Sequence, residues 1–197
     1  MLISAPSGGG KTTLCQQLLT ARPELTRVVT CTTRPPRAGE REGVDYHFLD
    51  VGSFLKRVHA GDFLEHATVY GNRYGMLKAE VLGKLRQGKD VLLNADVQGA
   101  ATIREQAQED LELKRALVSV FLTPPSMSIL EGRLRKRATD SEAVIQKRLD
   151  VARQEIAQWK HFDYLLLSAS IAEDLRRMLA IVEAEKMRSL RAPAPEF

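Results

Sequence analysis

The chain has 197 residues and a formal net charge of +4, with an isoelectric point near 9.2. This length allows one domain with excursions, or two small ones, around a proper core. Because no apolar run reaches membrane-spanning length and the N-terminus lacks a secretory signal pattern, we expect a cytoplasmic protein without a membrane partner. Cys15 and Cys31 lack metal-like spacing, which favours free thiols in a reducing compartment.

The first functional pattern is the segment Ser4–Thr13, with the sequence SAPSGGGKTT. It follows a short apolar run and precedes leucines at helical spacing, which predicts strand, glycine loop and helix, the context of a phosphate-binding loop. Glycines let backbone N–H groups converge on phosphate oxygens, while Lys11 would reach the outer phosphates and Thr12 would ligate Mg²⁺. Ala5 replaces the first glycine of the general pattern. A plain glycine turn that starts a helix is the alternative, but such a turn does not need the Lys-Thr pair.

The next segment combines a short strand with a rigid basic loop. Val28 to Cys31 is β-branched and predicts a strand, and the prolines and glycine after it exclude regular structure. Arg34 and Arg37 in this loop suggest an anion clamp, because guanidinium groups bind phosphate bidentately. A solvated basic loop is the alternative reading.

The remaining chain alternates predicted strands and helices. Asp50 is expected to cap a helix that ends near Gly61, and Ser141 to cap one with Ile145, Leu149, Ala152 and Ile156 along one face. The other predicted elements are strands at 43–49, 63–70, 90–96, 116–122 and 164–167, a turn at 71–75, and helices at 77–86, after 124–126, and at 172–190. This alternation predicts a three-layer α/β fold with a mainly parallel sheet.

Asp96 ends the apolar strand at 90–96, a position that suits the magnesium-side acid of a phosphate-loop enzyme. An aspartate that caps the next helix is the alternative. Arg133 to Arg137 form a basic cluster, which alone would indicate a solvated helix face or a weak nucleic-acid patch.

Several motifs follow the phosphate loop in a fixed order: T-T-R-x-P-R-x-G-E at Thr32–Glu40, G-x-D-Y-x-F at Gly43–Phe48, F-L-E at Phe63–Glu65, and G-N-x-Y-G at Gly71–Gly75. Together they resemble guanylate kinases, the nucleoside monophosphate kinases that phosphorylate GMP. The resemblance covers about residues 2 to 185. It implies reversible ATP-dependent conversion of GMP to GDP in purine nucleotide metabolism, with Mg²⁺ as cofactor.

The resemblance also implies a division of the chain. Residues 1–27 and 87–190 would form the phosphate-loop core, including an arginine-bearing lid at about 133–148. Residues 28–86 would form a GMP-binding lobe. Residues 191–197 are expected to be a disordered tail, given their proline content.

Site residues carried over from the resemblance fall into four sets. The catalytic set is Lys11, Arg37, Arg137 and Arg148. The ATP-binding set is Gly8, Gly9, Gly10, Lys11, Thr12, Thr13, Arg133 and Arg137. The GMP-binding set is Thr30, Arg34, Arg37, Tyr46, Glu65, Tyr74 and Asp96, with Glu65 accepting hydrogen bonds from the guanine edge. The metal set is Thr12 and Asp96.

The chain departs from the family pattern at four places. Asn94 replaces the first acid of D-x-D-x-Q-G, and Ala138 replaces a lid glycine. Ser168-Ala169 replaces an Asn-Asp pair near the ATP base, and Met76 stands where relatives carry a Ser or Thr whose hydroxyl meets guanine.

Three competing functions remain. A non-catalytic guanylate-kinase-like binding module is disfavoured by the intact Lys11-Thr12 pair. A same-fold kinase of another phosphorylated acceptor is disfavoured by Tyr46, Glu65 and Tyr74. A nucleic-acid binder is disfavoured because the arginines form no continuous stripe interleaved with aromatics.

Overall fold

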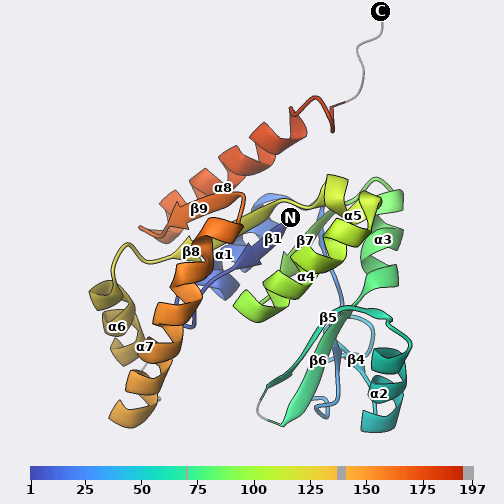
Figure 1. Ribbon diagram of the computed structural model, residues 1–197, viewed down its shortest axis with the longest axis horizontal. Coiled ribbons are helices and arrows are strands. Elements are labelled where there is room, and N and C mark those ends of the chain that lie inside the picture. The colour runs from blue at the N-terminus through green and yellow to red at the C-terminus, as the bar shows by residue number, and fades with distance from the viewer. Residues whose placement is uncertain (70, 137–140, 193–197) are drawn as a thin grey trace, which may run out of the picture. The chain divides into compact units, whose positions relative to one another are not determined.

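The computed structural model describes residues 1–69, 71–136 and 141–192 (Figure 1). Its contacts divide the chain into two compact units. The first comprises Met1–Pro23, Asn94–Val97 and Val118–Phe197, and the second comprises Glu24–Leu93 and Gln98–Leu117. The segment 28–86 lies wholly within the second unit. This unit also includes three segments that were predicted to belong to the phosphate-loop core, residues 24–27, 87–93 and 98–117.

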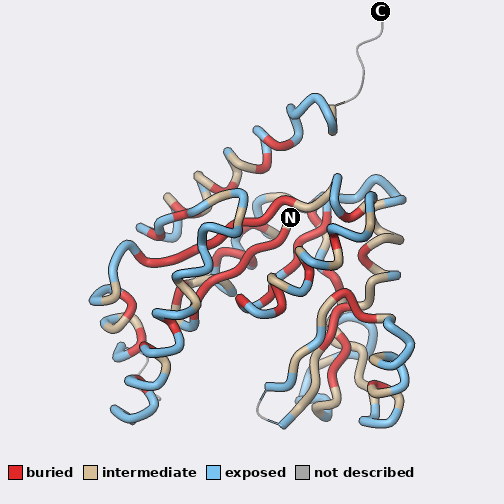
Figure 2. Tube along the Cα trace, viewed as in Figure 1, coloured by how far each residue is buried: buried red, intermediate tan, exposed pale blue. Residues whose placement is uncertain are grey.

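The first unit is built on a parallel sheet. Its strands β1 (Leu2–Ser4), β8 (Ser119–Thr123) and β9 (Tyr164–Leu167) run in the order β1-β8-β9, with Leu2 opposite Ser119 and Val120 opposite Tyr164. Every residue of β1 and β8 is buried (Figure 2). Parallel strands covered on both faces carry continuous apolar runs, so the predicted mainly parallel α/β fold is confirmed.

Helices surround this sheet in the first unit. They are α1 (Lys11–Ala21), α6 (Met127–Lys136), α7 (Glu142–Ile156) and α8 (Ile171–Lys186), with a 3₁₀ segment η1 (Ala157–His161). The predicted apolar face of α7 packs against α6 in a cluster that contains Leu130, Leu134, Ile145, Leu149 and Ala152. Burying these side chains stabilises the pair by roughly 1.5–3 kcal/mol for each large residue. This packing holds together the two helices that carry Arg133 and Arg148.

The second unit combines a small sheet with several helices. Its four-stranded sheet has the order β4-β3-β6-β5, from β3 (Cys31–Thr32), β4 (His47–Phe48), β5 (Phe63–Val69) and β6 (Asn72–Leu77). In the same unit, β2 (Leu25–Arg27) pairs in parallel with β7 (Asp90–Asn94). The helices are α2 (Val51–His59), α3 (Lys78–Arg86), α4 (Val97–Glu109) and α5 (Leu111–Ala116).

The core of the small sheet is aromatic. Phe54 of α2 is fully buried and stacks on Phe63 of β5, with ring centroids 4.6 Å apart. Asp50 caps α2 as predicted, because its Oδ1 accepts the Ser53 N–H at 2.8 Å. The cap and the aromatic pair together hold α2 on the sheet.

Three assignments from the sequence, two strands and one turn, were wrong. Residues 28–30 lie between β2 and β3 rather than in one strand, and the Val29 N–H donates to the Glu80 carboxylate at 2.9 Å. In the predicted strand 43–49 only His47 and Phe48 join the sheet, because residues 43–45 turn and Tyr46 forms an isolated bridge with Glu42. In the predicted turn 71–75, residues from Asn72 onward continue as β6, since β5 pairs Val69 directly with Asn72.

The C-terminal region also differs from expectation. Helix α8 spans Ile171–Lys186 and so ends before Leu190. Arg191, placed in the predicted tail, forms an ion pair with the buried Glu185. The rest of that tail, residues 193–197, lies outside the described residues. Within the described chain, no helix combines the length and apolarity needed to cross a bilayer.

Candidate functional site

The loop between β1 and α1 has the geometry of a phosphate cradle. Gly8 and Gly10 adopt left-handed backbone conformations, with φ of 88° and 99°. A Cβ on Gly8 would lie 2.8 Å from the Leu134 side chain, so the loop has neither the backbone nor the space for another residue there. Gly10 is the N-cap of α1 and supplies no side-chain cap. The N-terminal end of α1 lies in this loop, and its helix dipole favours an anion there.

A cavity of about 240 Å³ opens over this loop. It is lined by Ala5 to Thr13 together with Asp96 and Glu155. Among the predicted residues, the loop glycines, Lys11, Thr12, Thr13 and Asp96 therefore meet at one site. The Lys11 ammonium donates to Asn94 Oδ1, so the residue that replaces the family acid serves as a neutral partner for this lysine.

Sequence reasoning missed Glu155, which comes from α7. Burial raises the pKa of the Glu155 carboxyl, and the hydrogen bond that it accepts from the Ser7 N–H at 3.4 Å opposes this shift. The negative charge of Asp96 raises the same pKa and the positive charge of Lys11 lowers it. Its partner in the loop is 148 positions away in the sequence. No local pattern singles out such a residue.

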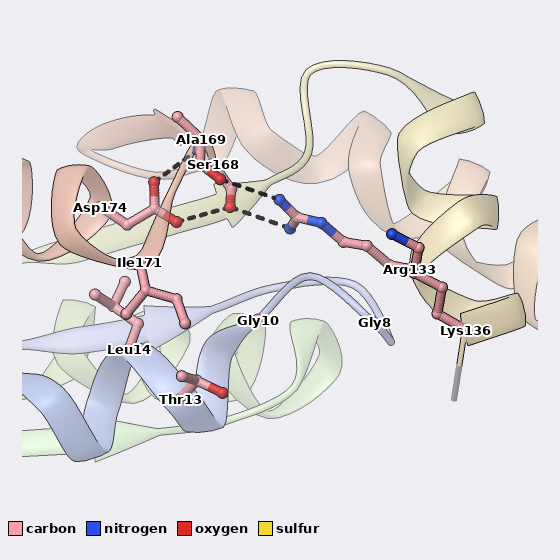
Figure 3. A pocket seen from close by; sticks show the side chains of 10 residues that line it. All are labelled: Gly8, Gly10, Thr13, Leu14, Arg133, Lys136, Ser168, Ala169, Ile171 and Asp174. Atoms are coloured by element: carbon pink, nitrogen blue, oxygen red, sulfur yellow. Dashed lines mark hydrogen bonds between the residues drawn. The ribbon is translucent and has the colours of Figure 1, made fainter. Parts of the chain in front are cut away.

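A second cavity of about 340 Å³ lies beside the same loop. Gly8, Gly10 and Thr13 line one side, α6 contributes Arg133 and Lys136, and the β9–α8 turn contributes Ser168 and Ala169 (Figure 3). Arg133 Nη1 donates to Ser168 Oγ at 3.1 Å, and Nη2 makes a longer contact of 3.5 Å with the Ala169 carbonyl. From the predicted ATP-binding set, this cavity is thus lined by Gly8, Gly10, Thr13 and Arg133. Gly9, Lys11 and Thr12 line the first cavity instead.

The other predicted lid arginines have different outcomes. Arg148 is half-buried on α7. Arg137 lies outside the described residues, so its predicted roles in catalysis and ATP binding remain predictions.

All of the predicted acceptor residues except Asp96, which lies in the first unit, belong to the second unit. Arg34 Cζ lies 5.4 Å from the centroid of the Tyr46 ring, and the Tyr46 and Tyr74 rings are 6.2 Å apart, edge to face. Tyr74 reaches this cluster because β6 pairs it with Thr32 of β3. The loop and the strand thereby bring together three residues that the sequence placed in one phosphate site.

Glu40 holds the basic loop in shape. Both carboxylate oxygens accept from Arg34 Nη2, at 2.8 and 2.9 Å, and one also accepts the Arg37 N–H at 2.8 Å. The Arg34 hydrogen bond and the Arg37 backbone bond lower the pKa of this carboxyl. The loop therefore has an internal anion that aligns Arg34, while Arg37 is exposed.

The remaining acceptor residues lie on or beside the same sheet. Glu65 of β5 is half-buried and stands directly opposite Met76 of β6, so the two side chains share a face of the hairpin. Met76 is buried. Thr30 precedes β3, and its carbonyl accepts the His47 N–H at 3.0 Å.

Comparison with known proteins gives consistent relatives. The family model described as guanylate kinase matches residues 1–185. The chain is 44% identical to a guanylate kinase of Alcanivorax borkumensis over 98% of this chain and 90% of that protein. It is also 44% identical to one of Coxiella burnetii, over 95% of this chain and 87% of that protein.

A solved structure agrees with these sequence relatives. The crystal structure of guanylate kinase from Anaplasma phagocytophilum superposes with a TM-score of 0.71 at 33% identity, covering 96% of this chain and 87% of that one.

Proposed function

Because the chain belongs to the guanylate kinase family, we propose that it transfers the γ-phosphoryl group of ATP to GMP, forming ADP and GDP. The observation that carries the proposal is the cavity over the phosphate loop, where Lys11, Thr12 and Asp96 meet. A loop retained only for protein binding has no need of an ammonium and a hydroxyl at these points.

The first unit binds the donor in this proposal. Backbone amides of the glycine loop hold the β-phosphate, and the Lys11 ammonium leaves Asn94 to pair with the outer phosphates. Since Asn94 is neutral, the hydrogen bond to it that this exchange breaks is weaker than a bond to a carboxylate would be. Arg133 contacts the same nucleotide from the neighbouring cavity.

The oxygen donors of this cavity fit Mg²⁺. The Thr12 hydroxyl and the Asp96 carboxylate line it together, and Mg²⁺ in kinases takes one or two protein oxygens and completes its shell with water and phosphate. When bound, the ion neutralises charge on the transferred phosphate. Thr12 and Asp96 would hold it there.

The second unit binds the acceptor. Arg34 and Arg37 pair with the GMP phosphate, and the Tyr46 and Tyr74 hydroxyls donate to it. Glu65 accepts from the N1–H and the exocyclic amine of guanine, a donor pair that adenine lacks. Adenine would leave the carboxylate poorly paired, so GMP is preferred to AMP.

The chemistry requires little beyond positioning and charge. The attacking oxygen belongs to the GMP phosphate, which is anionic near neutral pH, so no general base is needed. That oxygen forms a bond to the γ-phosphorus as the bond to the ADP oxygen breaks. Lys11, Arg37, Arg137 and Arg148 stabilise the charge that spreads over the transferring group.

An ADP-release assay tests the proposal, with GMP, dGMP, AMP, CMP and UMP as acceptors. We expect turnover with GMP well above that with AMP, CMP or UMP. Lys11→Ala should lower kcat at least about 100-fold, because the ammonium acts mainly in the transition state. Lys89→Ala, at an exposed position that lines neither cavity, is the matched control. Near-normal turnover of the Lys11 variant, or a preference for AMP, would contradict the assignment.

A further inference from the structure

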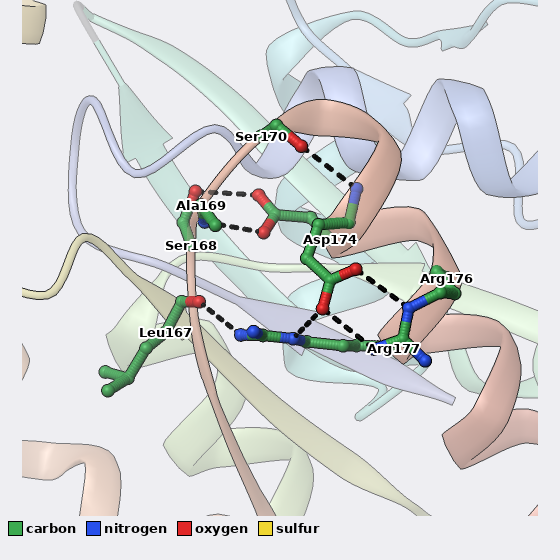
Figure 4. Close-up of polar contacts among 8 residues, drawn as sticks. Leu167, Ser168, Ala169, Ser170, Asp174, Arg176 and Arg177 are labelled. Atoms are coloured by element: carbon green, nitrogen blue, oxygen red, sulfur yellow. Dashed lines mark hydrogen bonds and ion pairs between the residues drawn. The ribbon is translucent and has the colours of Figure 1, made fainter.

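A buried carboxylate stands under the turn between β9 and α8. Asp174 is 6% exposed, and its two oxygens accept from the turn: Oδ1 from the Ala169 N–H at 2.8 Å and Oδ2 from the Ser168 hydroxyl at 2.7 Å (Figure 4). A buried carboxylate is costly unless it is hydrogen-bonded, so these two bonds fix the turn relative to the helix.

The first turn of α8 is itself held in place. The Ser170 hydroxyl accepts the Glu173 N–H at 3.2 Å as the helix cap, and Arg177 Nη1 donates to the Leu167 carbonyl at 3.0 Å (Figure 4). Asp174 therefore projects from a helix end that Ser170 caps and that Arg177 ties to β9. Its carboxylate occupies a fixed point.

Ser168 passes this constraint to Arg133. A hydroxyl has one hydrogen, and at Ser168 that hydrogen is directed to Asp174, so the oxygen lone pairs remain for the Arg133 guanidinium at 3.1 Å. Donation to a carboxylate also makes the hydroxyl oxygen a stronger acceptor. The three residues form a chain from carboxylate to hydroxyl to guanidinium (Figure 3).

The guanidinium ends beside the phosphate loop. A Cβ on Gly10 would lie 4.0 Å from Arg133 Nη1, and both residues line the 340 Å³ cavity. Of the five N–H donors of a guanidinium, the turn engages two among the described residues, so others are available for an anion in that cavity. An arginine without this tether would sample many rotamers.

We propose that Asp174 is a positioning residue that acts through Ser168 to hold the Arg133 guanidinium against the donor nucleotide. This inference rests on the proposed function, since it takes the donor to be a nucleotide whose phosphates lie in the loop. Asp174 touches no reacting atom. Asp174 affects the affinity for the donor nucleotide, and it acts through the Ser168 hydroxyl.

A double-mutant cycle on Arg133 and Ser168 tests the chain, with ADP binding followed by isothermal titration calorimetry. We expect Ser168→Ala to weaken ADP binding roughly 5- to 20-fold in the parent and by less than about two-fold in an Arg133→Ala background. Ser168→Thr keeps the hydroxyl and should restore binding. Ser170→Ala removes a neighbouring hydroxyl that only caps α8, and should leave ADP affinity within about two-fold.

Asp174→Asn probes the first link. If the asparagine amide turns its nitrogen to Ser168, that nitrogen competes with Arg133 for the serine oxygen. If it turns its nitrogen to Ala169, two N–H donors face each other and the hydrogen bond to the Ala169 N–H is lost. The first orientation weakens the Arg133 link directly, and the second loosens the turn that holds Ser168, so in both cases ADP binding should weaken measurably, at most as much as in Ser168→Ala. In steady-state assays the KM for ATP should rise while the KM for GMP stays unchanged. Circular dichroism at the assay temperature identifies a variant that fails to fold, and in that case the Arg133–Ser168 cycle carries the test.

The outcomes separate this inference from the proposed function. Equal losses from Ser168→Ala in both backgrounds, or unchanged ADP binding in a folded Asp174→Asn protein, would overturn it. Coupling between Arg133 and Ser168 in a protein that binds ADP but does not phosphorylate GMP would support the inference while rejecting the function. Normal GMP phosphorylation without coupling would reject the inference alone.

Discussion

For a substitution of Met76 by serine, we expect the stability of the protein to fall while its affinity for GMP rises. The side chain is 3% exposed and stands across the hairpin from Glu65. A Met76→Ser substitution would place a hydroxyl on the face that carries the guanine-binding carboxylate. One added neutral hydrogen bond contributes roughly 0.5–1.5 kcal/mol, so the Kd for GMP should fall about two- to twelve-fold.

The same substitution removes a buried side chain. Losing a core methionine costs roughly 2–4 kcal/mol, from the transfer free energy and the space left behind. For a chain of this size that corresponds to a Tm lower by roughly 4–16 °C. The variant should therefore be less stable and yet bind GMP more tightly.

Calorimetric titration with GMP at 15 °C, where the variant remains folded, separates the two effects, and thermal unfolding measures the cost. Met76→Leu is the matched control, because it keeps the apolar volume and adds no donor. GMP affinity that is unchanged or weaker in the folded serine variant would show that residue 76 does not face the guanine. A Tm within 2 °C of the parent would refute the burial argument.

Three further predictions concern the acceptor loop, acid stability and the thiols. Glu40→Gln should weaken GMP binding several-fold and leave ADP binding unchanged, because Glu40 aligns Arg34 in the second unit; equal losses for both nucleotides would contradict this. Hydrogen bonds from two arginines on α8 lower the pKa of Glu173 to about 2. The ionised carboxylate therefore stabilises the folded protein at pH values above its ordinary pKa near 4.5, and this stabilisation is lost as the pH falls toward 2. Glu173→Gln should accordingly flatten the fall in Tm over that range, and an unchanged profile would contradict the ion-pair argument. Burial raises the pKa of Cys15 and Cys31 to about 11. Ellman's reagent at pH 8 should therefore label these thiols only after unfolding in urea, and fast labelling of the native protein would refute the argument from burial.

The sequence by itself determined the features that depend on neighbouring residues. Gly8 to Thr12 specify the phosphate loop because glycine backbone freedom, the lysine and the hydroxyl all act within one turn of chain. Asp50 caps α2 three residues away, and the helical spacing from Ile145 to Ala152 identifies the buried face of α7. Each of these signals is short-range, so it can be read from the order of residues.

Tertiary structure decided the features in which distant segments meet. Tyr74 lies in a strand because β3 and β5 flank β6, although its Gly-Asn-x-Tyr-Gly context has turn composition. Glu155 reaches the loop only because α7 packs on α6. Asp174 is linked to Arg133 through Ser168 only because α8 follows the strand beside β8. An acidic residue in a helix looks the same in sequence whether it faces water or a cavity. Which of the two it faces depends on side-chain packing between segments that local patterns do not relate.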